Sequence, residues 1–257
     1  MLSHFNEITL FFLAVVIFLI TIEVGYRTGR RYRLRSDEEG YRHINALQTA
    51  LVGLLALLLG FNFALASSRF DSRKALIQDE SNAIWTAYLR AQLLPPAQAQ
   101  LMLPALRAYL ATRIEFMRAG GDEVEVEAAR AEVGRGDARL WDLTKKMLTT
   151  ETSTWRESSL VQSLNEMLDV KWKRRAALEN HVPEPVIHLL FLVAIGSFGF
   201  IAYNYGATGR RRHLSTAIFA LLIALVLAII LDFDRPNGGF IRVSDEEMVR
   251  LKAAMQE

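Results

Sequence analysis

Hydrophobic residues gather in four long stretches of the chain, and most charged residues stand between them. A helix of about 20 apolar residues crosses the roughly 30 Å hydrocarbon core of a bilayer. Each stretch is long enough to do so, and we therefore expect four transmembrane helices. Their approximate bounds are residues 6–26, 44–66, 186–205 and 214–231.

The segment between the second and third spans has a different pattern, in which apolar residues recur at helical spacing among many charges. It lacks the alternating β-branched runs of strands. We therefore predict an all-α membrane protein with a helical domain inserted between the second and third spans. Its expected parts are a first transmembrane pair in residues 1–66, a helical extramembrane domain in 67–184, a second transmembrane pair in 185–231 and a carboxyl-terminal extramembrane segment in 232–257.

Prolines and glycines set the expected helix ends in the middle segment. Nothing breaks the helical pattern between about residues 44 and 93, so the second span is expected to continue as one long helix until Pro95 and Pro96. Further along, Gly134 and Gly136 are expected to interrupt a charged, weakly amphipathic helix.

Basic residues are concentrated in two short loops. Residues 27–43 hold six arginines and three acidic residues, and Arg210–Arg212 form a second basic loop without acid. Short loops rich in Lys and Arg stay in the cytoplasm, whereas long segments are translocated regardless of charge. We therefore predict a multi-pass protein of the cell (inner) membrane, with both basic loops cytoplasmic and with both termini and residues 67–184 outside.

The composition argues against catalysis. The chain has no cysteine, its five histidines lack metal-ligand spacing, and it contains no nucleotide-binding or nucleophile motif in a supporting context. We therefore expect no enzyme activity, no cofactor and no metal site. Membrane topology and attraction to anionic lipids explain the arginine clusters, so lipids, and not nucleic acids, are the expected partners.

One face of the second span is polar at both ends and apolar in the middle. It could line a pore, because an apolar constriction can gate by dewetting and arginine rings favour anions. Alternatively, Asn62 bonds a neighbouring helix and the arginines meet lipid phosphates. The candidate pore residues are Gln48, Leu55, Leu59, Asn62, Ala66, Arg69 and Arg73.

A second face of the same span consists of small residues. Gly53, Gly60, Ala64 and Ser67 recur at helical spacing, which predicts that another helix can approach closely. Assembly of several copies around an axis would explain such a stripe.

Charged residues also follow the second and fourth spans. Carboxylates spaced by two could bind a hard cation, but a salt-bridge network with Arg69 and Arg73 needs no ion and is favoured. We expect this network to fix the carboxyl-terminal segment against the long helix. Its expected members are Asp79, Glu80, Asp232, Asp234 and Arg235.

Two motifs in this sequence resemble those of a known family. The first runs from Gly60-Phe61-Asn62-Phe63 through Asp79-Glu80-Ser81-Asn82 to Leu93-Leu94-Pro95, and the second joins Asp232-Phe233-Asp234-Arg235-Pro236 to Gly239-Phe240-Ile241-Arg242-Val243. Together they resemble an uncharacterised bacterial family of four-span membrane proteins described as bestrophin-like. Ser81 and Trp85 stand where the family is expected to carry Ala and Gly, a difference that concerns local packing.

The resemblance implies the layout of bestrophins, which are pentameric anion channels with four spans, a helical domain between the second and third, and a pore lined by the second. It also implies that this domain and both termini are cytoplasmic. We keep the opposite orientation, because the charge rule rests on the residues of this chain.

These observations favour a homo-oligomeric ion channel that conducts small anions through a pore lined by the second span, with a pentamer implied by the resemblance. The alternative is a non-conducting membrane scaffold or envelope sensor whose helical domain binds a partner. A channel requires the candidate pore face to converge on an axis, whereas a scaffold would bury it among its own spans.

Overall fold

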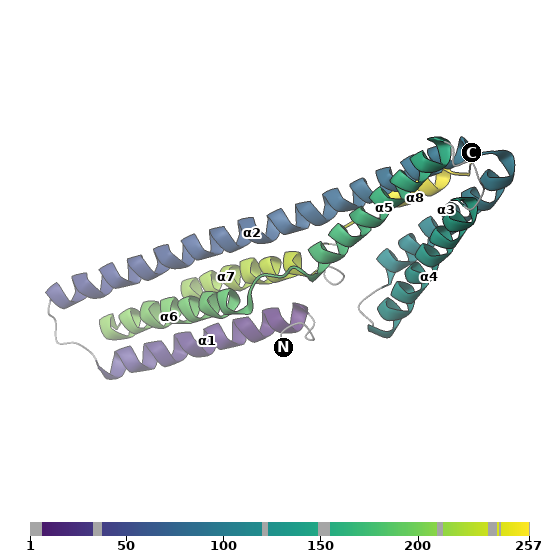
Figure 1. Ribbon diagram of the computed structural model, residues 1–257. Helices are drawn as coiled ribbons and strands as arrows, with labels where there is room; N and C mark the ends of the chain where they lie inside the picture. Colours follow the sequence, from purple (N-terminus) through teal and green to yellow (C-terminus); the bar gives the residue numbers. More distant parts are fainter. Residues whose placement is uncertain are drawn as a thin grey trace. The chain divides into compact units, whose positions relative to one another are not determined.

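The described residues of the chain fold into a series of helices (Figure 1). The computed structural model describes residues 7–32, 38–119, 123–148, 155–209, 213–235, 241 and 243–256. Every regular element in these residues is a helix, which confirms the all-α class. The helices are α1 (Glu7–Arg31), α2 (Glu38–Gln92), α3 (Pro96–Arg118), α4 (Glu123–Leu148), α5 (Trp155–Glu179), α6 (Glu184–Thr208), α7 (His213–Asp234) and α8 (Glu246–Ala254).

Two compact units divide the chain, and each has its own core. Unit 1 comprises Met1–Ser68 and His181–Arg235, and therefore holds α1, the first part of α2, α6 and α7. Unit 2 comprises Arg69–Asn180 and Pro236–Glu257, and holds the rest of α2 together with α3, α4, α5 and α8. As expected from the absence of a breaker, α2 is one helix of 55 residues that contributes to both units.

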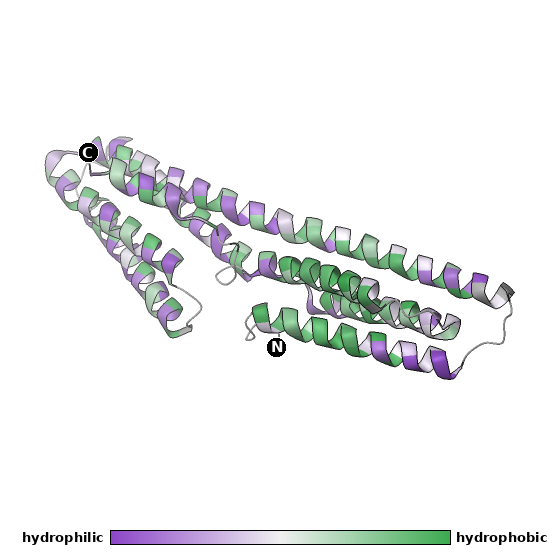
Figure 2. Cartoon of the chain, turned by 180° about the vertical axis from the view of Figure 1, so that it is seen from behind, coloured by the Kyte–Doolittle hydropathy of each residue, from purple (hydrophilic) through white to green (hydrophobic). Residues whose placement is uncertain are grey.

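The four predicted spans are confirmed by the helices of the structure. Four helical stretches are long and apolar enough to cross a membrane, and Figure 2 shows hydrophobic residues along the helices of unit 1. Part of the basic loops, residues 33–37 and 210–212, lies outside the described residues. The apolar windows lie within the segments Ile8–Arg31, Arg42–Gln92, Trp155–Thr208 and Leu214–Asp234.

Glycines bring α1 and α6 into close contact in unit 1. A Cβ atom built on Gly25 would lie only 2.6 Å from the backbone oxygen of Gly199. A Cβ on Gly29 or Gly206 would likewise overlap backbone atoms of the facing helix. Gly25 and Gly29 form a GxxxG pattern, which permits such an approach of helix backbones. The helix pair is therefore held by backbone packing that a larger residue would prevent.

Aromatic and aliphatic side chains fill the interior of unit 1. Phe18 of α1 and Phe198 of α6 are fully buried, and their ring centroids lie 4.9 Å apart. Leu227 of α7 joins the same core. Because these residues come from three different helices, the core ties α1, α6 and α7 together.

Unit 2 has a core of its own, built from α2, α3, α4, α5 and α8. Ile84, Leu106 and Leu160 are fully buried in it. The short helix α8 is attached because the hydroxyl of Tyr88 donates a hydrogen bond to the backbone oxygen of Met255 over 3.0 Å. The carboxyl-terminal segment is thus part of unit 2.

The expected helix break at Gly134 and Gly136 is wrong, because α4 continues through both glycines. A Cβ atom on Gly136 would lie 3.1 Å from the ring of Tyr109, so this glycine makes room for a buried aromatic residue. A glycine inside a helix costs only about 1 kcal/mol relative to alanine, which such packing can offset.

Candidate functional site

The candidate pore face of α2 lies inside the subunit. Leu55, Leu59, Asn62 and Ala66 are buried, and the leucines share the core of unit 1 with residues of α1, α6 and α7. The described face is thus packed inside unit 1, and its role as a pore lining stays a prediction. Sequence patterning could not distinguish the two cases, because a span in lipid is apolar on its packed and on its open faces.

Polar side chains on and beside this face form hydrogen bonds within unit 1. Asn204 of α6 donates hydrogen bonds through Nδ2 to Asn45 Oδ1 over 2.7 Å and to Gln48 Oε1 over 2.9 Å. Asn62 donates through Nδ2 to the backbone oxygen of Leu58 in its own helix, over 2.8 Å. The side-chain amide of Asn204 therefore holds α6 to α2, and that of Asn62 bonds to the backbone of its own helix.

The small-residue face of α2 is open in unit 1. Gly53, Gly60 and Ala64 are exposed, Ser67 is half-buried, and a Cβ atom on either glycine would meet no atom within 4 Å. Large apolar residues accompany them, since Leu57 is 56% and Phe61 is 66% exposed. The described part of the subunit thus leaves an apolar strip along α2 uncovered, which we call the open strip of α2 (Gly53, Leu57, Gly60, Phe61, Ala64).

Arg69 and Arg73, the arginines of the candidate pore face, belong to unit 2. Arg69 is half-buried, and Arg73 is buried. The guanidinium of Arg73 donates hydrogen bonds to the backbone oxygens of Ala177 and Asn180, each over 3.2 Å. These carbonyls stand at the carboxyl-terminal end of α5, where the helix dipole favours a cation. Arg73 therefore joins α2 to the end of α5.

One member of the expected charge network, Glu80, lies in the core of unit 2. Glu80 is fully buried in unit 2, where its carboxylate accepts hydrogen bonds from Arg113 Nη2 over 2.9 Å and from Arg174 Nη1 over 2.6 Å. Burial alone raises the pKa of the Glu80 carboxyl, but the charges and hydrogen bonds of the two arginines outweigh it, so the pKa lies below its ordinary value. Glu80 is therefore a charged residue that links α2, α3 and α5.

The other members of that network are found in both units. Asp79 is exposed in unit 2. Asp232 and Asp234 are buried and Arg235 is half-buried in unit 1. Asp234 accepts a hydrogen bond through Oδ1 from the backbone N–H of Val182 over 2.8 Å, which fixes the start of α6 against the end of α7.

Sequence reasoning missed Arg113 and Arg174 as the partners of Glu80. A signal was present, because Arg113 stands directly between apolar positions of α3 that are buried, Leu110 and Ile114. A charged residue in the apolar stripe of a helix needs a buried counter-ion. Which carboxylate supplies it depends on how α2, α3 and α5 pack.

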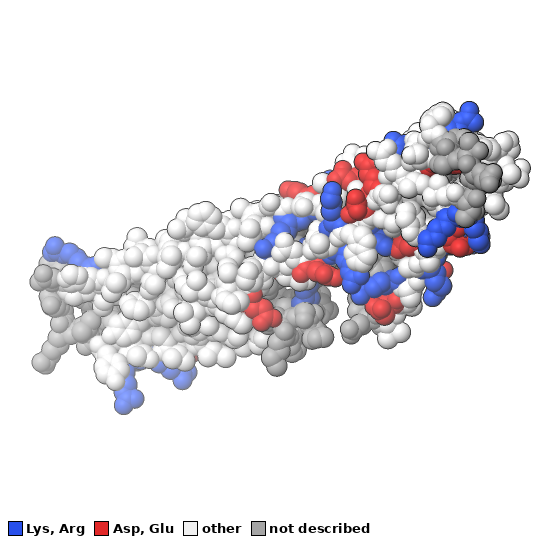
Figure 3. Space-filling model, viewed as in Figure 1, with Lys and Arg blue, Asp and Glu red and all other residues white. Residues whose placement is uncertain are grey.

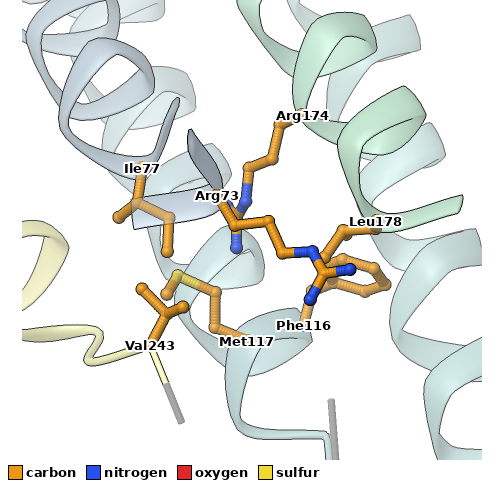
Figure 4. A pocket seen from close by; sticks show the side chains of 7 residues that line it. All are labelled: Arg73, Ile77, Phe116, Met117, Arg174, Leu178 and Val243. Atoms are coloured by element: carbon orange, nitrogen blue, oxygen red, sulfur yellow. The ribbon is translucent and has the colours of Figure 1, made fainter. Parts of the chain in front are cut away.

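A small pocket lies beside this cluster in unit 2 (Figure 4). It has a volume of about 30 Å³, and two of its lining residues are arginines. In the described part of the chain, no group of His, Cys, Asp and Glu is arranged to hold a metal ion. The lining residues are Arg73, Ile77, Phe116, Met117, Arg174, Leu178 and Val243.

Comparisons with known proteins agree on one family and one fold. A family model described as "Bestrophin-like domain" matches residues 10–248. Two crystal structures of a bacterial Bestrophin homolog from Klebsiella pneumoniae are similar to this chain. One is 14% identical, with a TM-score of 0.67 over 98% of this chain and 99% of that chain. The other is 14% identical, with a TM-score of 0.66 over 96% of each chain.

A crystal structure described as a membrane protein is similar as well, with 13% identity and a TM-score of 0.64 over 97% of both chains. No curated protein sequence matches the chain. At these identities the similarity concerns the fold, which is that of the bestrophin homologs.

Proposed function

The chain belongs to the Bestrophin-like family of membrane proteins, and on this premise we propose that it assembles into a homo-oligomeric channel that conducts small anions. The observation that carries the proposal is the open strip of α2. A pore built from one helix of each subunit requires a face that the subunit's own helices do not cover. The small residues Gly53, Gly60 and Ala64 would let copies of α2 approach one another, and Leu57 and Phe61 would form the apolar constriction.

The burial of the opposite face of α2 supports the choice of the open strip as the pore lining. Leu55, Asn62 and Ala66 are at most 5% exposed, so they would not meet water unless unit 1 came apart. Their role in the proposed channel is to hold α2 in register against α6 and α7. The constriction is therefore assigned to Leu57 and Phe61, two and one positions away from the residues that the sequence alone favoured.

Anion conduction is proposed because of the charge at one end of the spans. The loops at 27–43 and 210–212 are rich in arginine, and a cationic mouth raises the local concentration of anions. On the face drawn in Figure 3, the surface along unit 1 is largely uncharged, with Lys and Arg at one end. We propose a pentamer, the assembly that the resemblance to bestrophins implies, and native mass spectrometry of the detergent-solubilised protein would give the subunit number.

The absence of cysteine from the chain provides a direct test of the pore face. We expect Leu57→Cys and Phe61→Cys to lose anion flux in proteoliposomes after treatment with a charged thiol reagent. Phe12→Cys, an exposed position on α1, is the matched control and should keep its flux. Block of Phe12→Cys alone, or insensitivity of both α2 variants, would contradict the proposed pore lining.

The orientation is proposed from the positive-inside rule, with both termini and unit 2 outside the cell. Ser158 is exposed on α5, and Ser36 belongs to the first basic loop. In intact cells, we expect an impermeant thiol reagent to label Ser158→Cys and not Ser36→Cys. The reverse result would place unit 2 in the cytoplasm, as in the bestrophin layout.

A second candidate function is a scaffold or sensor that binds a partner through unit 2. It is favoured by two tryptophans of α5 that are exposed, Trp155 and Trp172, because exposed aromatic residues are enriched where proteins associate. This function predicts no ion flux from the purified protein. Flux that responds to Phe61 substitutions would leave it without support.

A further inference from the structure

A pocket in unit 1 lies at the end of the spans where the basic loops are attached. It has a volume of about 500 Å³, which falls within the ~300–1,000 Å³ of sites that bind small molecules. In Figure 1 the ends of α1 and α6 and the start of α2 lie together at that end of unit 1. Each of these three helices contributes to the pocket wall, whose residues are Gly25, Thr28, Ile44, Gly199, Phe200 and Tyr203.

The wall of this pocket suits a hydrocarbon chain. Four of its six residues are glycine, isoleucine or phenylalanine. The hydroxyl of Thr28 donates a hydrogen bond to the backbone oxygen of Val24 over 2.8 Å, so its own helix satisfies this polar group. Tyr203, the other polar residue of the wall, is half-buried and combines an apolar ring with a hydroxyl, as is typical of tyrosines at the boundary between lipid and water.

The pocket is open to the surroundings of unit 1, because Thr28 is exposed and Phe200 is 39% exposed. At the level of the spans, these surroundings are the bilayer or another copy of the chain. Ile44 stands nine positions before Gly53, about two and a half helical turns, and therefore lies on the side of α2 opposite to the open strip. A second copy packed on the open strip would thus leave the pocket to lipid.

The charge at this end of unit 1 is complementary to an anionic headgroup. Residues 27–43 hold six arginines against three acidic residues, and Arg210–Arg212 add three more arginines. Arg31 is exposed and follows Thr28 by three positions, so its long side chain covers the helical turn that holds Thr28. Arg30 is exposed too, but it lies about 200° around α1 from Thr28. Arg31 is therefore the arginine of α1 best placed to bind a phosphate above the pocket, a group that a guanidinium can hold through two N–H donors.

We propose that this pocket binds one anionic phospholipid from the leaflet on the side of the basic loops. One acyl chain lies between α1, α2 and α6, and the phosphate binds the guanidinium of Arg31. The lipid strengthens the attachment of α2 to α6, which the hydrogen bonds from Asn204 to Asn45 and Gln48 provide at the same end. The site does not depend on the proposed channel function, because it would bind lipid in a protein that conducts nothing.

Thermal unfolding of the purified full chain in detergent gives the first test. Dioleoyl-phosphatidylglycerol, which is anionic, should raise the unfolding temperature in a saturable way. Dioleoyl-phosphatidylcholine, which has the same acyl chains and no net charge, should have little effect, and so should inorganic phosphate. Equal shifts with the two lipids, or the same shift with inorganic phosphate alone, would overturn the site.

Two neighbouring arginines separate a specific site from general attraction to a basic surface. Arg31→Gln should raise the phosphatidylglycerol concentration at half the maximal shift about fivefold, the usual factor for one arginine at an anionic lipid surface. Arg30→Gln removes the same charge from the other side of α1 and should leave that concentration unchanged. Equal effects of the two substitutions would overturn the role of Arg31 and with it the site.

The acyl-chain part of the site is tested by filling the pocket. Thr28→Trp adds a large side chain to the pocket wall, leaves every charge in place and should abolish the lipid-dependent shift. Val16→Trp is the control, because Val16 is an exposed residue of α1 outside the pocket, and it should keep the shift. A full shift in Thr28→Trp would contradict the proposal.

Bromine locates the lipid without any substitution. In crystals of the wild-type chain grown with phosphatidylglycerol that carries brominated acyl chains, we expect an anomalous peak between Thr28, Ile44 and Phe200. A pocket without a peak would overturn the proposal, even where bromine is found elsewhere along the spans.

Discussion

At the scale of single residues, Glu80 joins three helices of unit 2. Its carboxylate is fully buried and binds Arg113, 33 positions away, and Arg174, 94 positions away. A buried ion pair contributes little net stability when compared with an apolar replacement, but removal of one partner leaves the others unpaired. The effect of a substitution at Glu80 therefore comes mainly from the two arginines that remain.

We expect Glu80→Gln to lower the free energy of unfolding by about 3–5 kcal/mol, the usual cost of breaking a buried ion pair. Asp79→Asn is a matched control, because Asp79 precedes Glu80 in the chain but is exposed. It should change the stability by less than about 0.5 kcal/mol. Denaturant unfolding of unit 2, followed by tryptophan fluorescence, measures both. Equal losses in the two variants would contradict the role of the Glu80 cluster.

The same carboxylate gives a pH dependence with a definite sign. Since the pKa of Glu80 is lower in the folded protein than in the unfolded chain, its contribution to stability is complete above the unfolded value of about 4.3. The contribution is lost as the pH falls from there through the folded pKa. The difference in unfolding temperature between wild type and Glu80→Gln should therefore be constant from pH 7 to about pH 5 and shrink below about pH 4. A difference that grows on acidification would have the wrong sign.

At the scale of the helices, the contact between α1 and α6 depends on glycine. Gly25 and Gly29 face Gly199, Tyr203 and Gly206 so closely that a Cβ atom has no room. Without a hydrophobic driving force between helices in lipid, packing of this kind determines which helices associate. The pair is therefore sensitive to the addition of a single methyl group.

We expect Gly29→Ala to destabilise unit 1 by about 1–3 kcal/mol, because the new methyl group overlaps backbone atoms of α6. Gly196→Ala is the control, since a Cβ atom there meets nothing within 4 Å and alanine favours helix. The thermal unfolding temperature in detergent should fall for the first variant and stay or rise for the second. A fall for Gly196→Ala alone would contradict the assigned contact.

Some of these helices could be predicted from the sequence, and others could not. The length of α2 was predictable because no proline or glycine pair interrupts its pattern before Pro95. The continuity of α4 was not, because whether Gly136 breaks a helix or admits a neighbour depends on Tyr109, 27 positions earlier. The local sequence pattern thus predicts that a helix is present, whereas packing against distant residues decides whether a glycine interrupts it.

At the scale of the whole molecule, the four spans and the family could be predicted from the sequence, but the face of α2 that the other helices of unit 1 leave uncovered could not. Leu55 and Leu57 are both leucines of one helix, yet they are 1% and 56% exposed. In lipid both faces of a span are apolar, so hydropathy does not distinguish them. The arrangement of α6 and α7 decides which face is left for a second copy or for a pore.

The central claim is that the open strip of α2 lines an anion pathway, and anion flux into proteoliposomes of the purified protein tests it most directly. We predict flux above that of empty liposomes, and a higher rate for Phe61→Ser, because a hydroxyl at the constriction favours wetting. Phe12→Ser, which changes another exposed phenylalanine, on α1, should behave as wild type. Flux that is absent from all three proteins, or that rises equally in both variants, would contradict it.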